Sequence, residues 1–310
     1  MSESPPIETS PDDGLCDKPK PIDVWFEDGT LLIKAEGTEF KVYRGILASK
    51  STVFRDMFEL NPHTTQEVPV LELSVSALDL AFFLKALHDI DFFLPPRFPN
   101  AAPFAIVAGI LRLSDMYDVP NLRKRAIEHL SVVYPTSIAE WDSSPQFEKM
   151  HILDHFGAIK LARDFNVSWI RPMAIYHVAS LSFNATLYRC LRDANLDPQD
   201  EYFVIRGIRA LKMLQALCSG PDIATNPRKC QSIEVCRSLL KAKRAAVLTD
   251  DGADPLKVAA SYSDGFCGYC MTLEAPLARE GVWSQIPAYL ADAQWAELAL
   301  EKRRATFVSK

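Results

Sequence analysis

The chain has 310 residues, of which 48% are hydrophobic and 24% charged, and its formal net charge is −6. This composition is typical of a globular protein with room for one large domain or two ordinary ones. The negative net charge argues against a nucleic-acid-binding protein, because phosphate binding needs clustered cations. No apolar run approaches the roughly 20 residues that a membrane-spanning helix requires, so no membrane contact is expected.

The N-terminal segment and the cysteines predict where the protein works. Residues 1–20 hold four prolines and five acidic residues, which predicts a disordered tail, and they lack the basic and apolar stretches of a secretory signal. The seven cysteines are odd in number and irregularly spaced. We therefore expect reduced thiols and a location in the cytoplasm or nucleus.

Ordered structure is expected from about residue 23. Two runs rich in β-forming residues, 31–35 and 39–43, flank Glu36-Gly37-Thr38 and predict a hairpin. Apolar residues at helical spacing then predict a first helix over residues 46–58. The elements that follow are a third strand over residues 68–73 and a mostly buried helix over residues 76–88.

Residues 89–103 interrupt this pattern, because they are too rich in proline for a helix and too apolar for a solvated loop. Two interpretations are open. The segment is either a loop packed on its own domain or a partner-binding surface that uses Phe92, Phe93 and Phe98.

Helical patterns resume at residues 104–117 and 120–133, and Pro135 ends the second. Beyond it the chain is mainly helical, with predicted helices over residues 147–165, 170–181, 200–217 and 232–248 and at least one more after residue 277. The predicted organisation is a tail over residues 1–20, an α+β domain over residues 21–135 and an all-helical region over residues 136–310.

Three segments of the α+β domain resemble the BTB/POZ family. They are Phe40-x-Val-Tyr-Arg-x-Ile-Leu-Ala-x-x-Ser51, Phe54-x-x-Met-Phe58 and Leu111-x-Leu-Ser-Asp-Met-Tyr-Asp-Val-x-x-Leu-Arg123. The resemblance covers residues 21–135 and implies a short mixed sheet flanked by helices, followed here by an all-α extension. The start at Trp25-Phe26-Glu-Asp-Gly29 and the segment from Leu161 to Tyr176 are similar to a large group of fungal, basidiomycete-type BTB proteins.

The resemblance implies a protein that binds other proteins and is not an enzyme. It places a charged groove at Asp23 and Arg44, which is either a partner site or a structural ion pair, and a contact face on the first helix at Val53 and Met57. We expect a weak or unswapped dimer, or a monomer, because the tail offers no extra helix for a swapped one.

A cullin-3 substrate adaptor is the alternative partner hypothesis. Family members that bind cullin-3 often carry an apolar-x-acidic motif in the third helix. Here that helix has Asp79 near its start, Lys85 near its end and no glutamate, which weakens this alternative and leaves it open.

Cys267-Gly-Tyr-Cys270 is the motif with possible chemistry of its own, since CxxC suits a redox pair or half of a zinc site. Cys230 and Cys236, or Cys218, would complete four ligands. Three interpretations remain open: cysteines that pack as small apolar residues, a structural zinc at Cys230, Cys236, Cys267 and Cys270, and a thiol-redox protein. No other cofactor is predicted.

Other chemical signatures are missing from the sequence, which has no phosphate-binding glycine loop, nucleophile elbow or dinucleotide fingerprint. His151 and His155 lie four residues apart, but no Glu follows the first His as in a metalloprotease. We expect both on a helix surface.

Overall fold

The computed structural model describes residues 24–60, 68–97, 100–144, 150–181, 184–223, 227–249, 252–258, 265–273 and 278–307. The predicted N-terminal tail lies outside these ranges. Among the described helices, none has the length and apolar character needed to cross a membrane.

A three-stranded mixed sheet opens the described fold. β1 (Leu31–Ala35) lies in the centre, antiparallel to β2 (Thr38–Val42) and parallel to β3 (Val70–Glu72). Glu36 and Gly37 join β1 to β2 with φ angles of 46° and 78°. A two-residue turn with both residues at positive φ follows the right-handed twist of its strands. The predicted hairpin and third strand are confirmed.

The predicted first helix is in fact two helices, α1 (Arg44–Lys50) and α2 (Thr52–Leu60). Ser51 separates them with an extended backbone, φ −126° and ψ 126°. Its hydroxyl oxygen accepts a hydrogen bond from the Phe54 N–H (3.0 Å), which caps the start of α2. A serine hydroxyl that replaces a backbone hydrogen bond of the helix does not change the spacing of the apolar residues, so the sequence did not predict the break between α1 and α2.

The next three helices were predicted and are confirmed: α3 (Ala77–His88), α4 (Phe104–Met116) and α5 (Pro120–Val133). α3 and α4 approach closely at Gly109, where an added Cβ would lie 2.7 Å from Asp79 Oδ1. The Asp79 carboxylate accepts two hydrogen bonds from the Arg112 guanidinium, at 2.7 and 2.9 Å. This bidentate pair joins the two helices.

The rest of the described chain is helical, as predicted. Its elements are α6 (Ile138–Ser143), α7 (Ile152–Asp164), η2 (Ser168–Ile170), α8 (Arg171–Ser180), α9 (Ala185–Ala194), α10 (Pro198–Cys218), η3 (Pro227–Lys229), α11 (Ile233–Thr249), α12 (Pro255–Val258), η4 (Cys270–Thr272), α13 (Arg279–Ala291) and α14 (Trp295–Phe307). The sequence did not predict α6, α9 and α12. α9, for example, is 10 residues long and buries only Leu187 and Leu191.

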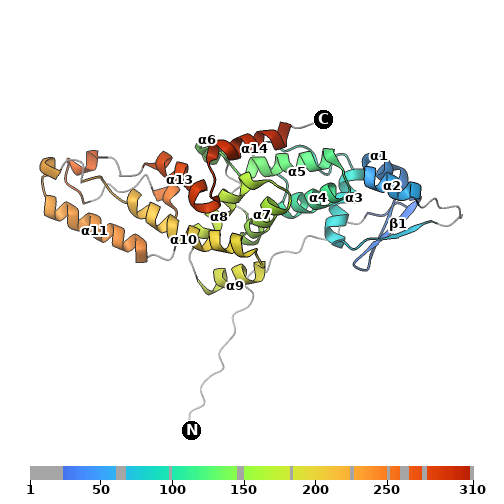
Figure 1. Ribbon diagram of the computed structural model, residues 1–310, viewed down its shortest axis with the longest axis horizontal. Coiled ribbons are helices and arrows are strands. Elements are labelled where there is room, and N and C mark those ends of the chain that lie inside the picture. The colour runs from blue at the N-terminus through green and yellow to red at the C-terminus, as the bar shows by residue number, and fades with distance from the viewer. Residues whose placement is uncertain are drawn as a thin grey trace, which may run out of the picture.

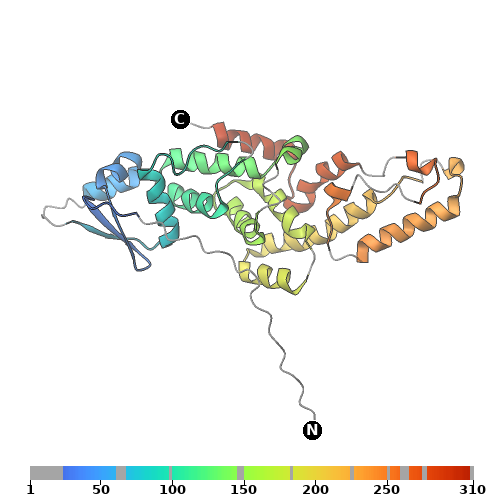
Figure 2. The same ribbon diagram turned by 180° about the vertical axis from the view of Figure 1, so that it is seen from behind.

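The molecule is elongated, with β1 and α2 at one end and α11 at the other (Figure 1), and Figure 2 shows the same arrangement from behind. One hydrophobic core runs from Val24 to Leu298, and α14 packs against α5, so the C-terminal helix returns to the N-terminal part. A second, much smaller core lies apart, at Ile223, Cys236, Phe266 and Cys270. Because the main core is continuous across residue 135, the predicted domain boundary between residues 135 and 136 stays a prediction.

The expectation of a surface position is wrong for His155. Its side chain is fully buried, and its ring centre lies 4.0 Å from that of His177 on α8. His151 is exposed and caps α7, because its Nδ1 accepts a hydrogen bond from the Leu153 N–H (3.3 Å). Helical spacing places two residues near one face, but only the packing of α8 on α7 decides which of them is covered.

Candidate partner-binding surfaces and metal centre

Arg44, one half of the predicted charged groove, is the first residue of α1. Its guanidinium donates a hydrogen bond to the Phe58 carbonyl oxygen (2.8 Å), and the guanidinium carbon lies 4.8 Å from the centre of the Phe58 ring. Carbonyls in the last turn of a helix lack helical partners, so Arg44 satisfies one of them and ties α1 to α2. Asp23 lies outside the described residues, and its pairing with Arg44 stays a prediction.

The predicted contact face on the first helix maps onto α2. Val53 and Met57 are half-buried and pack against the core from this helix. The outward side of α2 is charged and carries Arg55, Asp56 and Glu59. Leu60 at its end is 82% exposed. A partner would therefore meet a mostly charged helix with one exposed leucine.

A hollow of about 480 Å³ lies between the segment before β1 and the end of α3. Its walls include Val24, Trp25, Phe26, Lys85, His88 and Ile90. Trp25 is 43% and Ile90 75% exposed. The Phe26 ring centre lies 5.2 Å from that of His88, and burial lowers the pKa of His88.

Sequence reasoning missed this hollow, because its two walls are some sixty residues apart in the chain. The paired aromatics Trp25 and Phe26 were its one visible signal. Exposed large apolar side chains around a concave site are typical of contact surfaces.

The insert packs inward at Phe93 and is exposed at Ile90 and Leu94. Phe93 is 1% exposed, and its ring centre lies 4.7 Å from that of His129 on α5. Its carbonyl oxygen accepts a hydrogen bond from Arg125 (3.0 Å). The prediction of Phe93 as a contact residue is therefore corrected, since its ring serves the domain's own core. Phe92 is half-buried against that core, and Phe98 lies outside the described residues.

Residues 25–132 match the family model of the BTB/POZ domain. This chain contains a BTB/POZ domain. The match begins at the edge of the hollow and ends one residue before α5 does, so it covers the sheet and the helices α1 to α5. No curated protein matches the chain. The similarity to a fungal group of BTB proteins stays a prediction.

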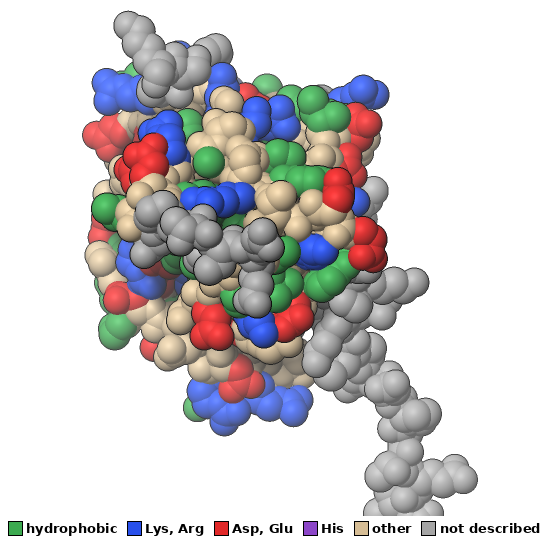
Figure 3. All heavy atoms as spheres, turned by 90° about the vertical axis from the view of Figure 1, so that its right-hand side faces the viewer, with side chains coloured by type: hydrophobic (Ala, Val, Ile, Leu, Met, Phe, Trp, Pro, Cys, Tyr) green, Lys and Arg blue, Asp and Glu red, His purple; other side chains and the backbone are tan. Residues whose placement is uncertain are grey.

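The end of the molecule that carries the BTB domain shows side chains of both charges, intermingled with hydrophobic ones (Figure 3). In this view no field of one sign dominates. A surface of this kind suits contact with another protein better than contact with a phosphate backbone, which needs a continuous basic stripe.

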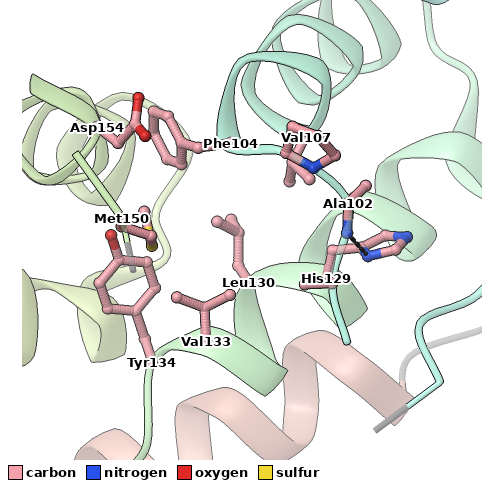
Figure 4. Close-up of a pocket in the computed structure, with 11 residues that line it drawn as sticks. Ala102, Phe104, Val107, His129, Leu130, Val133, Tyr134, Met150 and Asp154 are labelled. Carbon is pink, nitrogen blue, oxygen red and sulfur yellow. Dashed lines mark hydrogen bonds between the residues drawn. The ribbon is translucent and has the colours of Figure 1, made fainter. Parts of the chain in front are cut away.

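A pocket of about 310 Å³ lies between α4, α5 and α7, at the junction of the BTB domain and the extension (Figure 4). Its walls are mainly apolar, with Phe104, Leu130 and Met150 among them. Asp154 is the one carboxyl group in its lining, and burial raises the pKa of that carboxyl. His129 also lines the pocket, and its two ring nitrogens lie within hydrogen-bond distance of the Ala102 N–H (3.0 Å) and the Leu94 carbonyl oxygen (2.9 Å).

A larger groove lies between α10 and α11, in the extension, with a volume of about 710 Å³. Its floor is aliphatic, and several of the side chains are well exposed: Ile205 54%, Met213 44%, Leu217 37% and Leu248 57%. Arg209, Lys212 and Arg244 complete the lining. Sequence reasoning missed this groove, because each helix alone reads as an ordinary amphipathic one.

Four cysteines from three segments converge beside α11. Cys230 follows η3, Cys236 lies in the first turn of α11, and Cys267 and Cys270 flank the turn into η4. Their four Sγ atoms all lie within 4.8 Å of one another. Cys218, the other candidate ligand, is buried in the main core instead. The structure therefore brings together the four predicted metal ligands.

The thiols of this cluster differ in acidity. The backbone N–H groups of Cys270 and Gln231 lower the pKa of Cys267 to about 6, whereas burial raises the pKa of Cys270 and of Cys236. A thiolate near neutral pH is what both a metal site and a redox pair require, so acidity alone does not choose between them.

Proposed function

We propose that this protein works by binding other proteins at both ends of its long axis and catalyses no reaction. The BTB domain at one end supports this most directly, because such domains are interaction modules. In this view the domain contacts a second copy of the chain or another protein through the hollow at Trp25 and Ile90 and through α2. The groove between α10 and α11 supplies a second contact site.

Self-association through the BTB domain is expected to be weak. The outward side of α2 is charged, and Val53 and Met57 already pack against the core of their own chain. Tight homodimers bury a large, mainly apolar surface, whereas α2 offers one exposed large apolar side chain, Leu60.

Light scattering over a concentration series tests this proposal. We expect the average mass to rise from monomer towards dimer in the micromolar range, and the rise to be suppressed by Leu60→Asp or Ile90→Asp, because a charge then enters the contact. Leu153→Asp is the matched control, since Leu153 is an exposed leucine on α7, outside the domain. A dimer that persists at nanomolar concentration, or control and test variants that behave alike, would contradict the proposal.

A cullin-3 adaptor remains the competing function. Asp79, the acidic residue nearest to the family's motif, has its carboxylate engaged by Arg112, and its side chain is only 13% exposed. A carboxylate held in this way has little capacity left for a partner. Calorimetric titration with purified cullin-3 separates the two functions: heat of binding that is lost on mutation of half-buried α3 residues such as Lys85 would favour the adaptor.

The groove between α10 and α11 is suited to an amphipathic helix with acidic flanks. Residues 202–218 of α10 carry Arg206, Arg209 and Lys212 and no acidic residue. Residues 235–249 of α11 likewise carry Arg237, Lys241, Lys243 and Arg244 and no acidic residue. In a chain of net charge −6 this is a local reversal of sign. An apolar floor with basic rims is complementary to a helix that has one apolar and one acidic face.

Fluorescence anisotropy with designed helical peptides tests this second site. A Leu/Glu amphipathic peptide should bind, and Met213→Glu should weaken it at least ~10-fold, because the new charge enters the apolar floor and repels the acidic flanks. A Leu/Lys peptide of the same pattern is the matched control and should not bind. Equal binding of both peptides, or stronger binding of a single-stranded oligonucleotide, would contradict the assignment.

A further inference from the structure

The four cysteines of the cluster are free thiols in the structure, and the spacing of their sulfur atoms fits a metal. Cys230 Sγ lies 3.7 Å from Cys267 Sγ and 3.4 Å from Cys270 Sγ. A disulfide bond would require about 2.05 Å. Four sulfurs placed tetrahedrally around Zn²⁺, with bonds of about 2.3 Å, lie about 3.8 Å from one another. The four thiols are thus already gathered at nearly the separation that one ion would impose.

The backbone around the cluster is shaped to hold sulfur ligands. The Cys267 N–H donates a hydrogen bond to Cys236 Sγ (3.4 Å), which stabilises negative charge on that sulfur. Gly265 has a φ of 93°, in the left-handed region that favours glycine, and turns the chain just before Cys267. An added Cβ at Gly265 would lie 2.9 Å from Leu239 Cδ2, so the turn also packs closely on α11.

The region around the cluster has only a small hydrophobic core among the described residues. Its hydrophobic core contains four buried residues, of which two are Cys236 and Cys270 themselves. Within the described residues, this small core joins η3, η4 and α11 apart from the main core of the molecule. Units with so small a core usually need a metal or a disulfide for stability.

We propose that Cys230, Cys236, Cys267 and Cys270 bind one Zn²⁺ as a structural site. Four thiolates fill a tetrahedral coordination sphere and leave no open position for water or substrate, so the ion would stabilise the fold and catalyse nothing. Binding displaces the thiol protons and involves no oxidation or reduction. The ion would fix the start of α11 against the turn before η4. This inference does not depend on the proposed function.

Metal analysis of the purified full-length protein tests the proposal. We expect about one zinc per chain by mass spectrometry, and loss of that zinc in Cys236→Ser and in Cys270→Ser. Cys190→Ser is the matched control, because Cys190 is a half-buried thiol on α9, outside the cluster. This variant should keep its zinc. Substitution with Co²⁺ should give the visible absorption of a tetrahedral thiolate site.

Hydrogen exchange provides a second measurement that does not require a serine variant to fold. Chelation of the wild-type protein should increase exchange in η3, η4 and the first turns of α11 and leave the amides of β1 protected. Four outcomes would overturn the proposal: no zinc bound even after zinc is supplied, iron in its place, a disulfide between Cys267 and Cys270 in the native protein, or zinc retained in both serine variants.

Discussion

Replacing Asp200 by alanine should lower the free energy of unfolding by about 3 kcal/mol. Asp200 lies in the first turn of α10, and its side chain is only 1% exposed. Its carboxylate accepts hydrogen bonds from Arg163 on α7 (2.7 Å) and from Arg171 on α8 (2.5 Å). One carboxylate therefore joins three helices. Its removal leaves the Arg171 guanidinium, 19% exposed, without its counter-charge.

Urea denaturation of the Asp200→Ala variant measures this loss. Asp193→Ala is the matched control, because Asp193 pairs with Arg192 at the surface and both side chains are about two-thirds exposed. An exposed pair contributes little, and we expect a change of about 0.5 kcal/mol or less. If the two variants lost equal stability, the buried carboxylate would not be the anchor that its contacts indicate.

Trp169→Ala should cost about 3–5 kcal/mol of unfolding free energy and should loosen the C-terminal helix. Trp169 lies in η2 and is fully buried, so its removal leaves a cavity in the main core. α14 lies over it: the Lys302 ammonium is 5.5 Å from the centre of the indole, and Glu301 accepts a hydrogen bond from the Ser168 N–H (2.8 Å). The same ammonium donates to the Tyr134 carbonyl oxygen at the end of α5 (3.2 Å).

Denaturant unfolding and amide exchange together check this prediction. The amides of α14 should exchange faster in Trp169→Ala than in the wild type, because the helix loses the indole ring that Lys302 covers. Trp25→Ala is the control: Trp25 is 43% exposed on the BTB domain, so we expect about 1 kcal/mol or less and no change in α14. A Trp169→Ala protein with wild-type protection in α14 would show that the helix is held elsewhere.

The elements that depend on local pattern were predicted from the sequence. The hairpin, β3 and the helices α3, α4 and α5 have strong alternation or helical periodicity and clear breakers such as Pro120 and Pro135. Because the BTB fold is built from these elements in a fixed order, their residues also carried the resemblance that the family match supports. The four cysteines were predicted as a possible ligand set from the CxxC spacing.

The features that the sequence did not predict depend on segments distant in the chain or on a side chain that hydrogen-bonds to the backbone. Ser51 divides the predicted first helix, because its hydroxyl oxygen accepts a hydrogen bond from the Phe54 N–H. The Phe93 side chain is buried because it stacks on the His129 ring of α5. The hollow at Trp25 and the groove between α10 and α11 are each formed by segments distant in the chain, so no window of sequence contains them.

The sequence by itself determined the BTB domain, the helical nature of the extension and the presence of four cysteines suited to a metal, since periodicity, turn residues and motif spacing are local properties. Only the tertiary structure decided that the C-terminal helix closes back over α5, that Asp200 holds three helices together, and that the four sulfurs come within 4.8 Å of one another. The physical reason is that burial and ligand geometry depend on which distant segments pack together, and side-chain packing over the whole chain settles that choice.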